Sequence, residues 1–172
     1  PLCKPTTDDI KKISKISSDK TRVFVGYNHT VSKGISKILS IVKAREIGEI
    51  ITIDVEFREN WKGIFDAHPW LKGPEDTYLG FSERGGGASG EHSHAINLWQ
   101  HLSNECDFGK VIDIKSLMYK KSNKKVNYDE ICMVNFKTES NKIGRVVQDV
   151  VTLPVKKYAL IEGTLGKIEW YC

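Results

Sequence analysis

Glu91 and His94 are the two residues whose types and spacing best suit proton transfer. Residues three apart in a helix share a face, with Cβ atoms roughly 5–6 Å apart, so these side chains would be neighbours. An imidazole exchanges a proton near neutral pH, and a carboxylate beside it can orient the ring and raise its pKa. We therefore predict that His94 is a catalytic acid/base and that Glu91 assists it.

A run of glycines, Gly85 to Gly87, comes just before this pair. Glycine lets the backbone turn sharply and approach a ligand closely, and a helix N-terminus favours a negatively charged oxygen. Together these features suit the removal of a proton from a sugar hydroxyl as hydride leaves the carbon. The run also matches the Gly-x-Gly-x-x-Gly pattern of nucleotide-binding loops, but such a loop should follow a buried strand, which residues 78–84 do not resemble.

Residues 60–90 show no sustained hydrophobic period, and a connection of this length in a compact domain usually has a function. Its aromatic rings could form a platform for a sugar ring or simply pack the loop onto the domain. His68 and Arg84 could donate hydrogen bonds to hydroxyls or a phosphate, and His92 could face solvent or the edge of the substrate. The substrate-binding residues predicted here are Trp61, His68, Trp70, Arg84 and His92.

Two other interpretations of Glu91 and His94 remain open. His94 could pack against or cap a helix end while the Glu91 carboxylate interacts favourably with the helix dipole, because paired ionisable groups are often structural. Glu-x-x-His is also the ligand pair of di-iron helix bundles, but those need a second copy, which this sequence lacks. We therefore expect no metal, although a weaker possibility is a metal-dependent enzyme that uses Glu91, His92 and His94.

The composition fits a soluble globular domain with a sizeable core, since 40% of the 172 residues are hydrophobic and 28% are charged. No apolar run approaches the roughly 20 residues that span a bilayer, and no signal-peptide pattern is present. The lysines of residues 120–125 suit a solvated hairpin tip better than a nucleic-acid surface. Four cysteines without a Cys-x-x-Cys pair favour reduced thiols. We expect a cytoplasmic protein that binds neither membrane nor nucleic acid.

Hydrophobic periodicity predicts helices at residues 6–18, 32–44 and 91–102 and a strand buried on both faces at 23–25. Residues 51–57 alternate most clearly as a half-buried strand. Five further strands are predicted, separated by turn signals, at residues 111–119, 128–137, 142–151, 156–162 and 167–171. Short links favour antiparallel neighbours. The fold class is therefore α+β, a large mostly antiparallel sheet with helices on one face, preceded by a helix and strand that belong to half of a βαβ unit.

Four motifs in order give the chain a resemblance over its full length. It resembles the Gfo/Idh/MocA family of oxidoreductases, named after glucose–fructose oxidoreductase and inositol dehydrogenase. The matching segments are Pro1-Leu2, Val25-Gly26-Tyr27-Asn28, Ile47-Gly48-Glu49-Ile50, and Gly85-Gly86-Gly87 followed by Glu91-His92-Ser93-His94. The sequence departs from the family pattern with Glu in place of Asp at 91 and with His29-Thr30 after Asn28.

The resemblance implies an NAD(P)-dependent enzyme that acts on a sugar, polyol or nucleotide sugar. Residues 1–28 would be the tail end of an N-terminal Rossmann domain that binds NAD or NADP, and residues 29–172 the substrate-binding and oligomerisation domain. By analogy His94 is the acid/base, Glu91 takes the place of the usual aspartate, and the family's lysine would immediately precede Pro1. The expected cofactor-binding residues are Pro1, Tyr27 and Asn28.

The resemblance also implies a homodimer or tetramer packed through the sheet, and a fragment that is inactive by itself. The alternative is a non-catalytic carbohydrate-binding or oligomerisation module, which would bind sugar without depending on Glu91.

Overall fold

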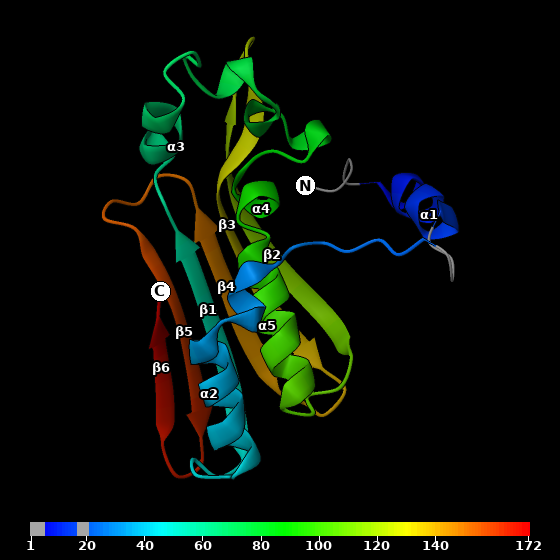
Figure 1. The fold of residues 1–172 in the computed structure, drawn as a ribbon, viewed down its shortest axis with the longest axis vertical. Coiled ribbons are helices and arrows are strands. Elements are labelled where there is room, and N and C mark those ends of the chain that lie inside the picture. The colour runs from blue at the N-terminus through cyan, green and yellow to red at the C-terminus, as the bar shows by residue number, and fades with distance from the viewer. Residues whose placement is uncertain (1–5, 17–20) are drawn as a thin grey trace.

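The computed structural model describes residues 6–16 and 21–172, and its described residues form a six-stranded sheet with helices on one side (Figure 1). The strands are β1 (Ile50–Arg58), β2 (Val111–Ser122), β3 (Asn127–Thr138), β4 (Ile143–Asp149), β5 (Lys156–Gly163) and β6 (Lys167–Tyr171). Their order is β2-β3-β4-β1-β5-β6, with β1 and β4 parallel and every other neighbouring pair antiparallel. The predicted α+β class with a mostly antiparallel sheet is confirmed.

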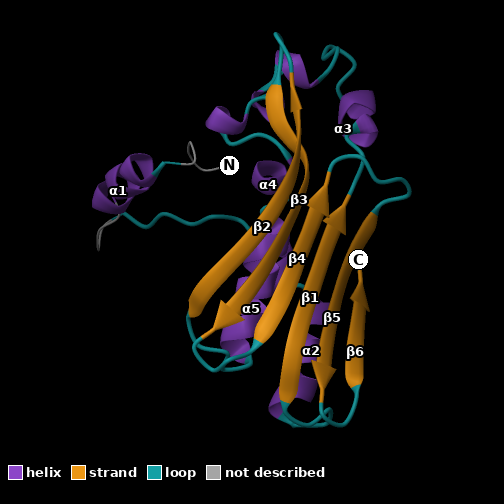
Figure 2. Ribbon diagram, turned by 180° about the vertical axis from the view of Figure 1, so that it is seen from behind, coloured by secondary structure: helices purple, strands orange, loops and turns teal. Residues whose placement is uncertain are grey.

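Two helices, α2 (Lys33–Lys43) and α5 (His94–Glu105), cover one face of the sheet, and Figure 2 shows the opposite face without a helix. Trp99 of α5 stacks on Phe136 of β3 at a ring distance of 4.2 Å and donates a 2.9 Å hydrogen bond to the Ile53 carbonyl. Gly144 makes room for this indole, because a Cβ there would lie 2.3 Å from Nε1 of Trp99. These contacts fix α5 across the centre of the sheet.

Strand β1 follows the predicted alternation, with Ile53, Val55 and Phe57 buried on the helix side. Pairing with β5 shifts register between Ile50 and Thr52, so Ile50 is buried while Ile51 is exposed. The predicted helix at 32–44 is also confirmed as α2, whose first turn is capped by the Ser32 hydroxyl accepting from the Ile35 amide at 3.4 Å.

The N-terminal elements differ from the prediction. Helix α1 (Thr7–Ile16) forms, with the Thr6 hydroxyl accepting from the Asp9 amide, but Ile10 and Ile16 are exposed and the helix stands apart from the sheet (Figures 1 and 2). The predicted strand at 23–25 is wrong for this structure: the segment has no regular structure and Phe24 is 81% exposed. A strand buried on both faces needs neighbouring strands, and none of the described strands lies beside it.

The segment between β1 and α5 carries short elements, namely α3 (Lys62–Ala67), three 3₁₀ turns η2 (Pro74–Asp76), η3 (Tyr78–Gly80) and η4 (Ser82–Arg84), and α4 (Ala88–Glu91). The helix predicted at 91–102 is interrupted, because α4 ends at Glu91 and α5 begins at His94. The Ser93 amide bonds to the Gly90 carbonyl and the Ala95 amide to the His92 carbonyl, so the chain tightens there and turns His92 inward. Among the described helices none has the length and apolar character that crossing a bilayer requires.

Candidate active site

A cleft of 410 Å³ lies where residues 24–27 pass the junction of α4 and α5. Its walls contain both members of the predicted catalytic pair, Glu91 and His94, together with Tyr27 and Tyr78. The remaining lining residues are Phe24, Val25, Gly26, Gly90 and Ser93. The interruption between α4 and α5 therefore does not separate the pair, which faces a common open space.

Glu91 and His94 act on each other through charge, since no hydrogen bond joins them. Glu91 Oε2 instead accepts a 2.7 Å hydrogen bond from the Tyr78 hydroxyl. Within the described part of the chain, Nδ1 of His94 is buried and has no hydrogen-bond partner. A buried nitrogen without a partner is costly to keep.

The His94 ring is held between two aromatic edges. Tyr27 and His29 each lie edge-to-face with it at ring distances of 5.3 Å. Burial lowers the pKa of His94 below its ordinary value of 6.5, with Lys157 acting in the same direction and Glu91 opposing them. The imidazole is therefore mainly neutral near pH 7, the form in which it accepts a proton.

His29, which the sequence analysis did not select as a site residue, comes from the 3₁₀ turn η1 (Asn28–Val31). It packs edge-to-face on Phe57 at 4.8 Å and on Trp170 at 6.1 Å. Burial lowers its pKa, and His94 and Lys157 lower it further while Glu59 raises it. The one available signal in the sequence was its place directly after the Val-Gly-Tyr-Asn segment.

His92 does not reach the cleft as a substrate contact. It is 6% exposed, and its Nε2 is buried without a partner among the described residues. Burial lowers its pKa despite the opposing charges of Glu59 and Glu91. Glu59 is itself paired with Lys157 at 2.9 Å, so this ion pair influences both His92 and His29.

The other predicted substrate-binding residues lie outside the lining of the cleft. Trp61 is buried against Tyr128 at a ring distance of 4.9 Å. His68 and Trp70 pack edge-to-face on each other at 5.1 Å, and His68 Nδ1 lies 2.7 Å from the Ile64 carbonyl oxygen. The Arg84 guanidinium lies 4.1 Å above the Phe81 ring. The structure thus gives each of these four side chains a packing partner away from His94.

A second hollow of 480 Å³ adjoins the cleft across Tyr27, which lines both. It is also lined by Asn28, Thr30 and Asn97, and the buried Oδ1 of Asn97 has no hydrogen-bond partner among the described residues. An unpaired amide oxygen beside a largely apolar hollow suits a ligand that carries a hydrogen-bond donor. Of the predicted cofactor contacts, Tyr27 and Asn28 border this hollow, and Pro1 lies outside the described residues.

The glycine run serves packing within the protein, which differs from the ligand approach that its sequence suggested. A Cβ at Gly86 would lie 2.2 Å from the Tyr78 carbonyl oxygen, and one at Gly90 would lie 1.9 Å from that of Gly85. Gly87 has a φ of +84°, and a Cβ there would meet Asp129 Oδ1 at 2.2 Å. Asp129 in turn accepts hydrogen bonds from the Ser89 amide and hydroxyl at 2.7 and 3.0 Å. The glycines therefore allow the turn η3, which carries Tyr78, and strand β3 to pack closely against the short helix α4.

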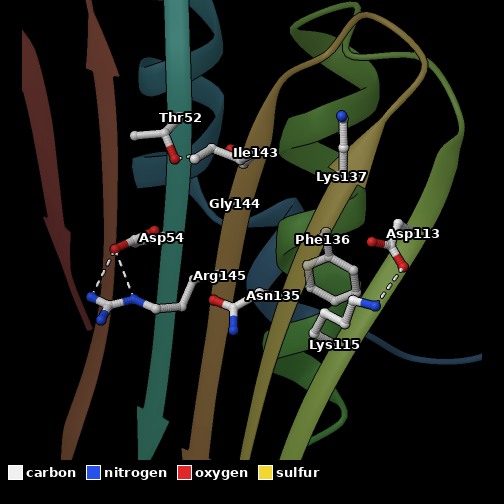
Figure 3. A pocket seen from close by; sticks show the side chains of 10 residues that line it. All are labelled: Thr52, Asp54, Asp113, Lys115, Asn135, Phe136, Lys137, Ile143, Gly144 and Arg145. Carbon is white, nitrogen blue, oxygen red and sulfur yellow. Dashed lines mark hydrogen bonds and ion pairs between the residues drawn. The ribbon is translucent and has the colours of Figure 1, made fainter.

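A hollow on the opposite side of the sheet has a different character (Figure 3). It measures 620 Å³ and runs across β1, β4, β3 and β2. Two ion pairs lie in it: Arg145 reaches Asp54 at 2.7 Å, and Lys115 lies 3.8 Å from Asp113 (Figure 3). Paired charges on a sheet face indicate a structural or contact surface and not a reaction centre.

No cluster of three or more potential metal ligands occurs among the residues that the structure describes. Cys106, Cys132 and Cys172 are free thiols, and burial raises the pKa of both Cys106 and Cys132 to about 11. These two thiols are thus protonated and unreactive at neutral pH.

Comparison with solved structures identifies several dehydrogenases with the same fold. GenD2 from gentamicin A biosynthesis, in complex with NAD, matches with a TM-score of 0.76 and 15% identity over 96% of this chain and 44% of its own. The WlbA dehydrogenase from Bordetella pertussis, in complex with NADH and UDP-GlcNAcA, matches with a TM-score of 0.73 and 17% identity over 96% and 47%. Levoglucosan dehydrogenase, with NADH and levoglucosan, matches with a TM-score of 0.74 and 17% identity over 95% and 44%.

The chain therefore spans less than half the length of each of these dehydrogenases. The fold implied by the Gfo/Idh/MocA resemblance is confirmed, and the proteins that share it include sugar and nucleotide-sugar dehydrogenases. No family model matches the sequence, and no curated protein matches it.

Proposed function

We propose that this chain is the substrate-side domain of an NAD(P)-dependent oxidoreductase that acts on an alcohol of a sugar, polyol or nucleotide sugar. The observation that carries the proposal is the His94 imidazole, neutral near pH 7 and half-buried in an open cleft with a carboxylate, Glu91, on the same wall. A neutral imidazole accepts the proton of a bound alcohol, and the charge of Glu91 stabilises the imidazolium that results.

Residues 1–28 belong, in this proposal, to a dinucleotide-binding domain completed by further sequence. The exposed apolar side chains of α1 and residues 23–25 support this, because Ile10, Ile16 and Phe24 are 58, 63 and 81% exposed. Large exposed apolar side chains that gather in one part of a chain are typical of a surface that contacts a partner. The solved dehydrogenases that share the fold, each more than twice as long as the part matched, are consistent with such a domain.

The cofactor site would be the hollow beside Tyr27. Asn97 Oδ1 and the Asn28 side chain would hold the carboxamide end of a nicotinamide there, next to the cleft that contains His94. When bound, a nicotinamide supplies the acceptor for the hydride that leaves the substrate carbon. The chain's own residues orient the alcohol and remove its proton: His94 takes it, and Tyr27 and His29 keep the ring in one orientation.

His94→Ala, made in the complete protein that contains this chain, tests the proposal. Turnover of a sugar alcohol should fall about 10²- to 10⁴-fold, the usual contribution of a general base, while NAD(H) binding is retained. His101→Ala is the matched control, since His101 lies on the same helix but lines a different hollow. Unchanged turnover in His94→Ala would remove His94 from the mechanism, and sugar binding without any turnover would favour the non-catalytic carbohydrate-binding module.

The open face of the sheet supports an assembly through that face. Leu117, Tyr119, Met133 and Ile143 are 77, 65, 41 and 59% exposed there, and Leu117 and Met133 are directly opposed in the β2–β3 register. We propose that a second copy of the chain covers them. Leu117→Lys combined with Met133→Lys should convert a dimer to a monomer in sedimentation analysis, whereas the same assembly state in the variant would contradict this.

A further inference from the structure

The Tyr78 hydroxyl forms a hydrogen bond with Glu91, one of the two proposed catalytic residues, and the sequence analysis did not predict this contact. It donates to Glu91 Oε2 at 2.7 Å, and both side chains line the cleft with His94. Burial raises the pKa of Tyr78 well above its ordinary value, and the hydrogen bond to Glu91 raises it further. The phenol therefore remains protonated, and so remains a donor, throughout the pH range in which an acid/base histidine works.

The protein backbone holds Tyr78 in this place. The Thr77 hydroxyl accepts from the Leu79 amide at 3.0 Å and closes the turn η3, and the Leu79 carbonyl accepts from the Gly87 amide at 2.9 Å. Gly86 lies so close to the Tyr78 carbonyl that a Cβ would not fit between them. The turn that carries Tyr78 is thus packed directly against the glycine run that leads to Glu91.

We propose that Tyr78 is a positioning residue whose hydroxyl fixes the Glu91 carboxylate beside His94. The inference rests on the proposed acid/base role of His94. With Oε2 occupied by the phenol, Glu91 acts on the imidazole through its charge and keeps Oε1 for a substrate hydroxyl next to the reacting one. Tyr78 touches neither reacting atom in this arrangement and acts through Glu91.

The test is the titration of His94 in the complete protein, followed by NMR of ¹³C-labelled histidine rings, in Tyr78→Phe, Glu91→Gln and the double variant. Glu91→Gln should lower the His94 pKa because it removes the carboxylate charge that opposes burial. Tyr78→Phe should lower it by a smaller amount, since an untethered carboxylate spends part of its time turned to water. In the double variant Tyr78→Phe should add nothing to the effect of Glu91→Gln.

Tyr158→Phe is the matched control, because Tyr158 also donates to a glutamate, Glu169, at 2.9 Å, but on the open face of the sheet. It should leave the His94 titration unchanged. Where turnover can be measured, Tyr78→Phe should reduce kcat about tenfold, the effect of one lost hydrogen bond to a charged group.

Three results would overturn the proposal. An unchanged His94 titration in Tyr78→Phe means that the phenol does not fix the carboxylate. A rise in the His94 pKa means that Tyr78 draws Glu91 away from the imidazole. A shift that persists in the Glu91→Gln background means that Tyr78 acts by another route. Because the NMR measurement needs no turnover, a failure of the proposed enzymatic function remains distinguishable from a failure of this inference.

Discussion

The two faces of the sheet differ in whether their buried or half-buried ionisable groups have partners. On the open face, Glu56 accepts from Arg58 and Lys156 at 3.0 Å each, and Arg58 also reaches Asp149 at 3.2 Å. On the helix side, His92 and His94 each bury a ring nitrogen that lacks a partner in the described structure. Matched charges stabilise a surface, whereas unmatched buried groups reduce stability and are typical of reaction sites.

The pKa shifts on the two faces have different origins. Burial favours the protonated form of Glu56, but its neighbouring cations outweigh that effect and lower its pKa. Burial lowers the pKa of His29, His92 and His94, and no anion near them is close enough to reverse the effect. Three experiments test this difference between the two faces of the sheet, and they follow in order of decreasing expected effect.

The largest loss of stability is expected from Gly86→Ala, a substitution on the helix side of the sheet. Its Cβ would lie 2.2 Å from the Tyr78 carbonyl oxygen, and backbone cannot move aside as a flexible side chain can. We expect a loss of about 3 kcal/mol or more in the free energy of unfolding, measured by urea denaturation. Gly63→Ala in α3 is the control, because nothing lies within 4 Å of its Cβ position; it should be neutral or stabilising by up to about 1 kcal/mol. Equal effects would mean that the glycine run is not packed as described.

A smaller effect, of about 1–2 kcal/mol, is expected from Glu56→Gln on the open face. The amide cannot serve as the anionic acceptor of both Arg58 and Lys156, and Glu56 is only 9% exposed. Glu91→Gln on the helix side should change stability by about 0.5 kcal/mol or less, since among the described residues its carboxylate accepts a side-chain hydrogen bond only from Tyr78. Comparison of the two urea curves checks this, and a larger loss for Glu91→Gln would reverse the contrast between the faces.

The smallest effect is the pH dependence of stability between pH 7.5 and 5.5. His29, His92 and His94 have folded-state pKa values below the ordinary value of 6.5, so the unfolded chain binds their protons more readily. Stability should therefore fall as pH drops through that ordinary value. The contribution of Glu56 is still present there, since its lowered pKa means that it is lost only at more acid pH. In His92→Leu the dependence should be weaker, and an unchanged slope in thermal unfolding would exclude His92 as a source.

The sheet was predictable because its signals are local. The alternation in β1, the turn residues between the later strands and the apolar face of α2 each lie within about a dozen residues, and all three are confirmed. The prediction of a strand at 23–25 was wrong for the opposite reason. An apolar run shows that a segment prefers burial, but whether it forms a strand depends on neighbouring strands from other parts of the chain.

The site was predictable only in part. The spacing of Glu91 and His94 predicted that the two side chains lie close together, and both line one cleft although the helix between them is interrupted. The aromatic loop does not contribute Trp61, Trp70 or Arg84 to the lining of that cleft, because each packs on a ring elsewhere, a contact that no periodicity reveals. The contact of His29 with His94 and the hydrogen bond of Tyr78 to Glu91 were not predicted, because both residues come from other segments of the chain.

The parallel pairing of β1 with β4 has a consequence for how the molecule folds. These two strands are neighbours in the sheet, yet everything from Glu59 to Lys142 intervenes along the chain, including strands β2 and β3 and the residues from Tyr78 to His94 that line one side of the cleft. Contacts between segments so distant in sequence form slowly, because a long loop must close before they are made. Insertions between Arg58 and His94 would lengthen that loop and lower the free energy of unfolding only slightly. The segment between β1 and β4 can therefore change to suit a new ligand while the two strands keep their register.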